Sequence, residues 1–148
     1  MEYSVESAFQ SSKVFENGGP YKDLLNKSSV EAKRDRRIKE SGSLIHFSYR
    51  NMIFPLFPKT LFYDWLYINA LNCYPDLGQA ALEYNAFTDI AFNPQKSLNC
   101  QARSVAIYVS LKKNGLFDQS LESKDSFLEI VYGNEAQCPN VEQTSLWE

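Results

Sequence analysis

The segment 60–73 constrains the fold of this chain more than any other. Most of its positions are apolar or aromatic, among them Leu61, Phe62, Trp65, Leu66, Ile68, Ala70 and Leu71. A helix that is apolar on all sides has no face suited to water, so other elements must cover it. We therefore expect a helix from Thr60 to Cys73 that is central and buried on most sides.

The composition allows such a core in one domain. The chain has 148 residues, of which 44% are apolar, and its formal charge is −3. A basic contact surface is therefore expected only as a local patch. Cys73, Cys100 and Cys138 lack metal-ligand spacing and indicate free thiols in a reducing compartment. No secretion leader is recognisable, and no stretch approaches the ~18 apolar residues of a membrane span, so we expect a cytoplasmic protein without membrane contact.

The local patterns predict a mainly α fold of roughly five helices with a small β-hairpin. Helices are expected over 4–15 and 29–40, the second opened by the capping-box pattern Ser28-x-x-Glu31. Residues 44–57 predict a hairpin with Arg50-Asn51 as its polar turn and a strand that ends at Pro55. Helices are also expected over 75–84 and over 97–113; Ser97 caps the second of these, and Gly115 ends it. A strand is favoured over 127–132, and the last fifteen residues are expected to be a tail.

The first predicted helix carries Glu6, Gln10 and Lys13 at i, i+4 and i+7. On a helix these three side chains share one stripe, next to an apolar stripe that contains Phe9. Such a stripe forms either a solvated face or one side of a polar pocket. As a bare pattern, the solvated face is by far the more common case.

A second constellation is the basic run 33–39, in which five of seven residues are cationic. A local positive patch in an acidic protein binds phosphates of a nucleotide or a nucleic acid. The alternative is a solvated helix face balanced by Glu31, Asp35 and Glu40. The cationic residues are Lys33, Arg34, Arg36, Arg37 and Lys39.

The third constellation is a long polar segment from Tyr84 to Arg103. Long loops inside apolar chains are often functional, and a helix N-terminus near Lys96 and Arg103 favours anions. The alternative is a loop tied to itself by side chain to backbone bonds. Its polar residues are Asp89, Asn93, Lys96, Asn99 and Arg103.

Several of these blocks occur in the same order in one family. They are Val5-Glu6-Ser-Ala-Phe-Gln10-Ser-Ser-Lys13, Gly19-Pro-Tyr21, Phe62-Tyr-Asp-Trp-Leu-Tyr67 and Phe92-Asn-Pro-Gln-Lys-Ser-Leu-Asn-Cys-Gln-Ala-Arg103. The chain resembles the NADAR (YbiA-like) family over roughly residues 3–117. It is most similar to the subgroup of antitoxins encoded beside DarT-type toxins, which ADP-ribosylate guanine bases in DNA.

This resemblance implies a hydrolase that removes ADP-ribose from guanine by cleaving an N-glycosidic bond, with no metal and no cofactor. The implied partners are ADP-ribosylated DNA or ADP-ribose and a DarT-type toxin. Lys13 is the candidate nucleophile, and Glu6 or Asp89 the candidate acid/base, because a desolvated amine can attack a sugar and a carboxylate stabilises the developing cation. Ligand-binding candidates are Gln10, Lys33, Arg34, Trp65, Asn93, Lys96, Asn99 and Arg103; DNA-binding candidates are Arg36 and Arg37.

The sequence departs from the family pattern at its start. Family members usually carry a strand with a Leu-Ser-x-Phe-like motif before the helix that bears the glutamate, whereas here that helix comes almost first. We therefore expect a NADAR-like domain over 1–117 without that strand, and an extension over 118–148. Two alternatives stay open: an N-glycosidase of a small ribosylamine, and a non-catalytic protein that binds ADP-ribose or the toxin. The basic run favours the DNA substrate.

Overall fold

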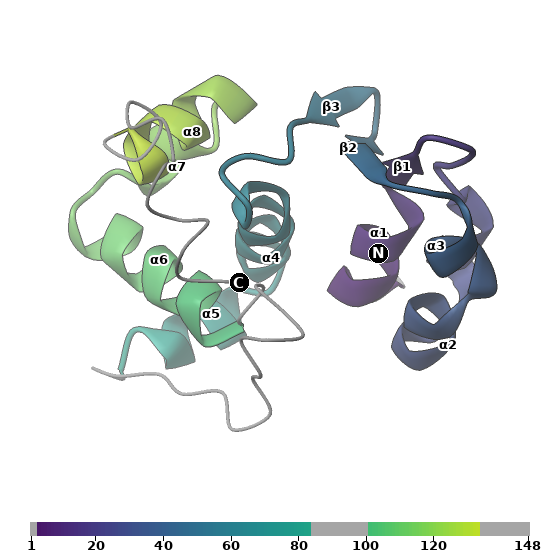
Figure 1. The fold of residues 1–148 in the computed structure, drawn as a ribbon. Helices are drawn as coiled ribbons and strands as arrows, with labels where there is room; N and C mark the ends of the chain where they lie inside the picture. The colour runs from purple at the N-terminus through teal and green to yellow at the C-terminus, as the bar shows by residue number, and fades with distance from the viewer. Residues whose placement is uncertain (1–2, 84–100, 134–148) are drawn as a thin grey trace. The chain divides into compact units, whose positions relative to one another are not determined.

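The computed structural model describes residues 3–83 and 101–133, and its contacts divide the chain into two compact units, 1–70 and 71–148 (Figure 1). The boundary falls inside one helix, α4 (Leu61–Cys73). The described residues are mainly helical, with one small antiparallel sheet, as the sequence predicted. No helix among the described residues is long and apolar enough to cross a membrane.

The first unit combines short helices with a three-stranded sheet of order β1-β2-β3. The predicted hairpin is confirmed, and its turn residues Arg50 and Asn51 have φ values of 47° and 64°, as a tight two-residue hairpin turn requires. The third strand, β1, was not expected. The elements are α1 (Val5–Ser11), β1 (Lys13–Phe15), the 3-10 helix η1 (Lys22–Asn26), α2 (Ser29–Arg34), α3 (Arg36–Glu40), β2 (Leu44–Tyr49), β3 (Met52–Phe54) and most of α4.

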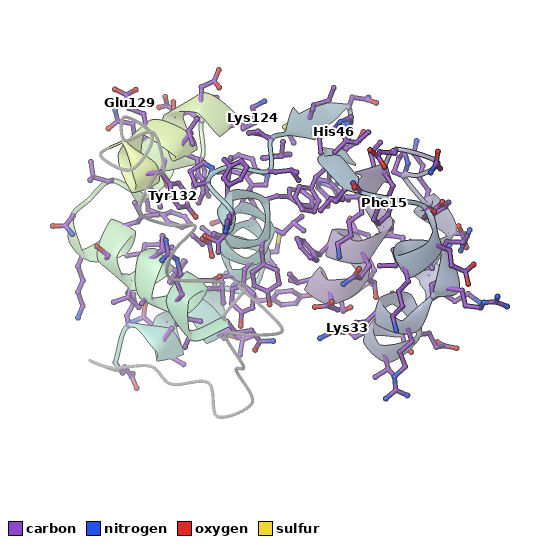
Figure 2. All side chains as sticks on the ribbon, in the orientation of Figure 1. Phe15, Lys33, His46, Lys124, Glu129 and Tyr132 are labelled. Carbon is purple, nitrogen blue, oxygen red and sulfur yellow. The ribbon has the colours of Figure 1, made fainter. Side chains whose placement is uncertain are left out.

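An aromatic core holds this unit together. Phe62 of α4 is 1% exposed, and its ring centroid lies 4.8 Å from those of Phe47 and Phe54 and 6.0 Å from that of Phe9. Trp65 packs on Phe54 at 5.8 Å. The rings thus join α1, the sheet and α4, and the expectation of a buried helix over 60–73 is confirmed (Figure 2).

The first helix is shorter than predicted. Ser4 caps it, but it ends at Ser11, and Lys13 begins β1, opposite Phe47 of β2. The helical i+7 position assigned to Lys13 was therefore wrong. The hydroxyls of Ser11 and Ser12 both donate to the Ala8 carbonyl, a local bonding pattern that competes with helix continuation.

The predicted helix over 29–40 is two helices. The capping box is confirmed, since the Ser28 side chain accepts from the Glu31 backbone and the Glu31 carboxylate accepts from the Ser28 backbone. The break falls at Asp35, whose backbone leaves the helical region and whose carboxylate accepts from the Arg37 N–H to start α3. An N-cap residue inside an otherwise helical pattern thus divides the segment.

In the described residues the second unit is helical. The strand favoured over 127–132 was wrong, because Ser123 caps a helix there and Phe127 and Tyr132 are buried on its inner side. Gly115 has φ +69° and follows the end of the preceding helix, as predicted. The elements are the last residues of α4, α5 (Pro75–Ala81), α6 (Gln101–Lys113), α7 (Phe117–Ser120) and α8 (Lys124–Tyr132). The helix predicted over 75–84 ends earlier, at Ala81, with Leu82 as its C-cap. The predicted cap Ser97 and the tail 134–148 lie outside the described residues.

Candidate functional site

Glu6 and Gln10 form the first part of the site, one helical turn apart on α1. The amide Nε2 of Gln10 donates to Glu6 Oε1 at 2.7 Å, so the i, i+4 pairing predicted for these two residues is confirmed. Gln10 is only 5% exposed, whereas Glu6 is partly exposed. A carboxylate that reaches the surface is therefore held in place by a buried amide.

Lys13 belongs to the strand β1, whereas Glu6 and Gln10 belong to the helix α1. Its Nζ lies 5.0 Å from the centre of the Phe9 ring, and the side chain is partly buried. Burial lowers the pKa of the Lys13 amine, the Glu6 carboxylate opposes that shift, and the positive charge of Lys33 adds to it. The site therefore contains an amine that loses its proton more easily than a solvated lysine does.

A network of serines fixes α1 at this site. The Ser7 hydroxyl, fully buried, donates to the Lys27 carbonyl at 2.8 Å, and the Ser29 hydroxyl donates to Ser4 Oγ at 2.7 Å. These bonds tie α1 to the start of α2, which carries Lys33. Sequence reasoning missed this network; serines at buried positions of an otherwise apolar helix were the available signal.

The structure divides the basic run into paired and unpaired cations. Arg37 donates through Nη1 and Nη2 to Asp23 at 3.1 and 2.6 Å and through Nε to Asp35 at 2.9 Å, and it lies over the Tyr21 ring at 4.5 Å. These bonds lower the pKa of both carboxyls. Arg36 pairs with Glu40 at 3.1 Å.

The other three cations of the run differ from these two arginines in their exposure and pairing. Lys33, Arg34 and Lys39 are exposed, and no ion pair with another described residue is formed by any of them. Figure 2 shows the charged side chains of α2 and α3 extending outward from the ribbon, with Lys33 labelled. A phosphate would meet these three cations without having to displace a carboxylate of the described residues first.

The remaining candidates are distributed over the chain. Trp65 is 7% exposed and packs on Phe54, so its described contacts are those of a core residue. Arg103 lies in α6 of the second unit, with its guanidinium 6.0 Å from the Tyr132 ring. The four other candidates, Asp89, Asn93, Lys96 and Asn99, lie outside the described residues and stay predictions.

The model of one protein family, the DarT1-associated NADAR antitoxins, matches residues 1–141. The chain belongs to this family. The resemblance seen in the sequence is thereby confirmed, and the chain is an antitoxin associated with a DarT-type toxin. The match extends past the predicted domain limit at residue 117 and includes α7 and α8. No curated protein matches the chain.

Proposed function

We propose that this antitoxin removes ADP-ribose from guanine in DNA and so reverses the modification made by its toxin. The observation that carries the proposal is Lys13 of a DarT1-associated family, a partly buried amine over the Phe9 ring whose pKa is lowered by burial and influenced by the charge of Glu6. Cleavage of an N-glycosidic bond needs a nucleophile at the anomeric carbon and a negative charge near the cation that develops there. Lys13 and Glu6 supply these two groups.

The proposed chemistry uses the neutral form of Lys13. Its Nζ attacks the anomeric carbon of the ribose, the bond from that carbon to the guanine nitrogen breaks, and the nitrogen takes up a proton. The sugar ring opens to an imine with Lys13. Water then adds to the imine carbon, which releases ADP-ribose and restores the amine. Glu6 is the proposed acid/base, and Asp89 is the second candidate for that role.

Cationic side chains would hold the rest of the substrate. The diphosphate of ADP-ribose carries negative charge, and Lys33 lies near enough to Lys13 to affect its pKa. We assign Lys33 to the diphosphate; Lys96 and Arg103 remain candidates for the same role. The exposed cations Arg34 and Lys39 are assigned to DNA phosphates, because contacts of this kind fix the protein on the strand without reading sequence.

The experiment is a cleavage assay on an oligonucleotide that carries ADP-ribosylated guanine. The protein should release free ADP-ribose and leave unmodified guanine, both identified by mass spectrometry. Lys13→Ala and Glu6→Gln should each reduce turnover at least about a hundredfold, the usual contribution of a single acid/base or nucleophilic group. Lys59→Ala removes a cation elsewhere in the first unit and is the matched control.

Three outcomes would refute the proposal in different ways. Cleavage of a small ribosylamine but not of the modified DNA would identify a metabolite N-glycosidase. Tight ADP-ribose binding without turnover by the native protein would identify a non-catalytic binder. Full activity of both site variants would show that the chemistry takes place elsewhere in the chain.

A further inference from the structure

The amide oxygen of Gln10 is the one buried side-chain polar atom of the described residues that has no hydrogen-bond partner. The orientation of this amide is fixed chemically, because the Glu6 carboxylate only accepts and must therefore face Nε2. Oε1 consequently points away from Glu6. Buried acceptors in native proteins are nearly always satisfied, so an exception needs an explanation.

Neighbouring donors do not supply the missing bond. The hydroxyl of Ser7 is committed to the Lys27 carbonyl, and those of Ser11 and Ser12 are committed to the Ala8 carbonyl. An acceptor that no described residue pairs and that lies one turn from the proposed catalytic carboxylate is suited to a donor carried by a ligand.

We propose that Gln10 Oε1 accepts a hydrogen bond from the 2-hydroxyl of the ribose whose glycosidic bond is cleaved. This inference rests on the proposed function. Glu6, which holds the Gln10 amide, is the carboxylate assigned to the anomeric carbon. The hydroxyl on the adjacent sugar carbon is therefore the nearest donor that such a substrate presents to Gln10.

This contact would make the site specific for one of two glycosidic bonds in the substrate. ADP-ribosylated guanine in DNA has one glycosidic bond to a ribose and another to the 2-deoxyribose of the strand. Cleavage of the second bond would damage the DNA. A deoxyribose has no 2-hydroxyl, so its binding would leave Gln10 Oε1 buried and unpaired, which a site built for a hydroxyl strongly disfavours.

The test compares two ligands and two proteins by calorimetry. The ligands are ADP-ribose and the analogue that lacks the 2-hydroxyl on its terminal ribose. The native protein should bind ADP-ribose at least about tenfold more tightly, or about 1.4 kcal/mol. In Gln10→Met the two affinities should become equal, because the acceptor is gone. Gln79→Met, which changes an exposed glutamine of α5, should keep the native preference.

Thermal unfolding separates this positioning role from a structural one. Gln10→Met loses the bond to Glu6 but also removes an unpaired buried acceptor, so its unfolding midpoint should equal or exceed that of the native protein. A large drop in the midpoint would mark Gln10 as structural and overturn the inference.

The remaining outcomes are distinguishable. Equal binding of both ligands by the native protein overturns the role of Gln10 and leaves the proposed function standing, whatever the variant does. The same holds if Gln10→Met keeps the native preference. Failure of the native protein to bind ADP-ribose or to cleave the modified DNA overturns both proposals.

Discussion

Neutralising Arg34 and Lys39 tests whether the basic run contacts DNA. Both side chains are exposed, and neither forms an ion pair with another described residue, unlike Arg36 and Arg37. A free cation that meets a phosphate releases a condensed counterion, whereas a cation already paired with a carboxylate must give up that partner first. The variant Arg34→Gln/Lys39→Gln should therefore reduce both the affinity for DNA and its dependence on salt.

The expected change follows from two phosphate contacts. Each contact to duplex DNA contributes about 0.9 to the slope of log K against log salt, so the slope should fall by about 1.8. Between 50 and 200 mM salt, the native protein should thus lose about twelvefold more affinity than the variant, because this range is a fourfold change in concentration. Single-stranded DNA would give a smaller difference, since each contact then contributes about 0.7.

Fluorescence anisotropy with a labelled, unmodified duplex measures this slope at four or five salt concentrations. The control, Lys59→Gln/Lys113→Gln, removes the same charge from other parts of the chain and should keep the native slope. Equal slopes of log K against log salt for the native protein and Arg34→Gln/Lys39→Gln would refute the DNA contact. The basic run would then be an ordinary solvated surface.

Three further predictions concern the first unit. Because the pKa of Lys13 in the folded protein lies below 10.5, the unfolded chain binds more protons between the folded and unfolded pKa values, and stability rises with pH across that window. Lys13→Met should therefore have a higher melting temperature than the native protein at pH 7, and this difference should shrink toward pH 10.5. A difference that stays constant with pH would contradict the prediction. Gly19→Ala should destabilise by about 1–3 kcal/mol in urea titrations, because φ is +92° and the new Cβ would meet the Lys13 carbonyl; an unchanged midpoint would contradict this. Phe62→Ala should cost about 3–5 kcal/mol, and Ile53→Ala, at a side chain 58% exposed, should cost less than about 0.5; similar losses would argue against an aromatic core.

The parts of the fold that local chemistry decides were predictable from the sequence. An apolar run has to be buried, so the helix over 60–73 followed from composition. The polar Arg50-Asn51 pair between apolar runs marked the hairpin turn, and Ser28 with Glu31 marked the start of α2. The Glu6–Gln10 bond followed from helical spacing alone.

The parts of the fold that were not predicted depend on contacts between residues far apart in the sequence. Residues 13–15 become a strand because β2, some thirty residues later, pairs with them, and that pairing replaces the last turn of the predicted helix. Glu6 still affects the pKa of Lys13, although Lys13 lies in β1 and not in the helix of Glu6. At 127–132 the apolar and β-branched residues suggested a strand, whereas the Ser123 cap and two buried aromatics fix a helix.

Reductive trapping of Lys13 tests the proposed mechanism most directly. The protein is mixed with DNA carrying ADP-ribosylated guanine in the presence of borohydride, digested, and analysed by peptide mass spectrometry. The account predicts an ADP-ribose adduct on the peptide that contains Lys13, and no adduct in Lys13→Arg, which should still bind ADP-ribose but lose nearly all turnover, since an arginine cannot supply a neutral amine. Near-native turnover by Lys13→Arg, without a trapped adduct in either protein, would contradict it and leave Lys13 as an electrostatic contact beside a water activated by Glu6.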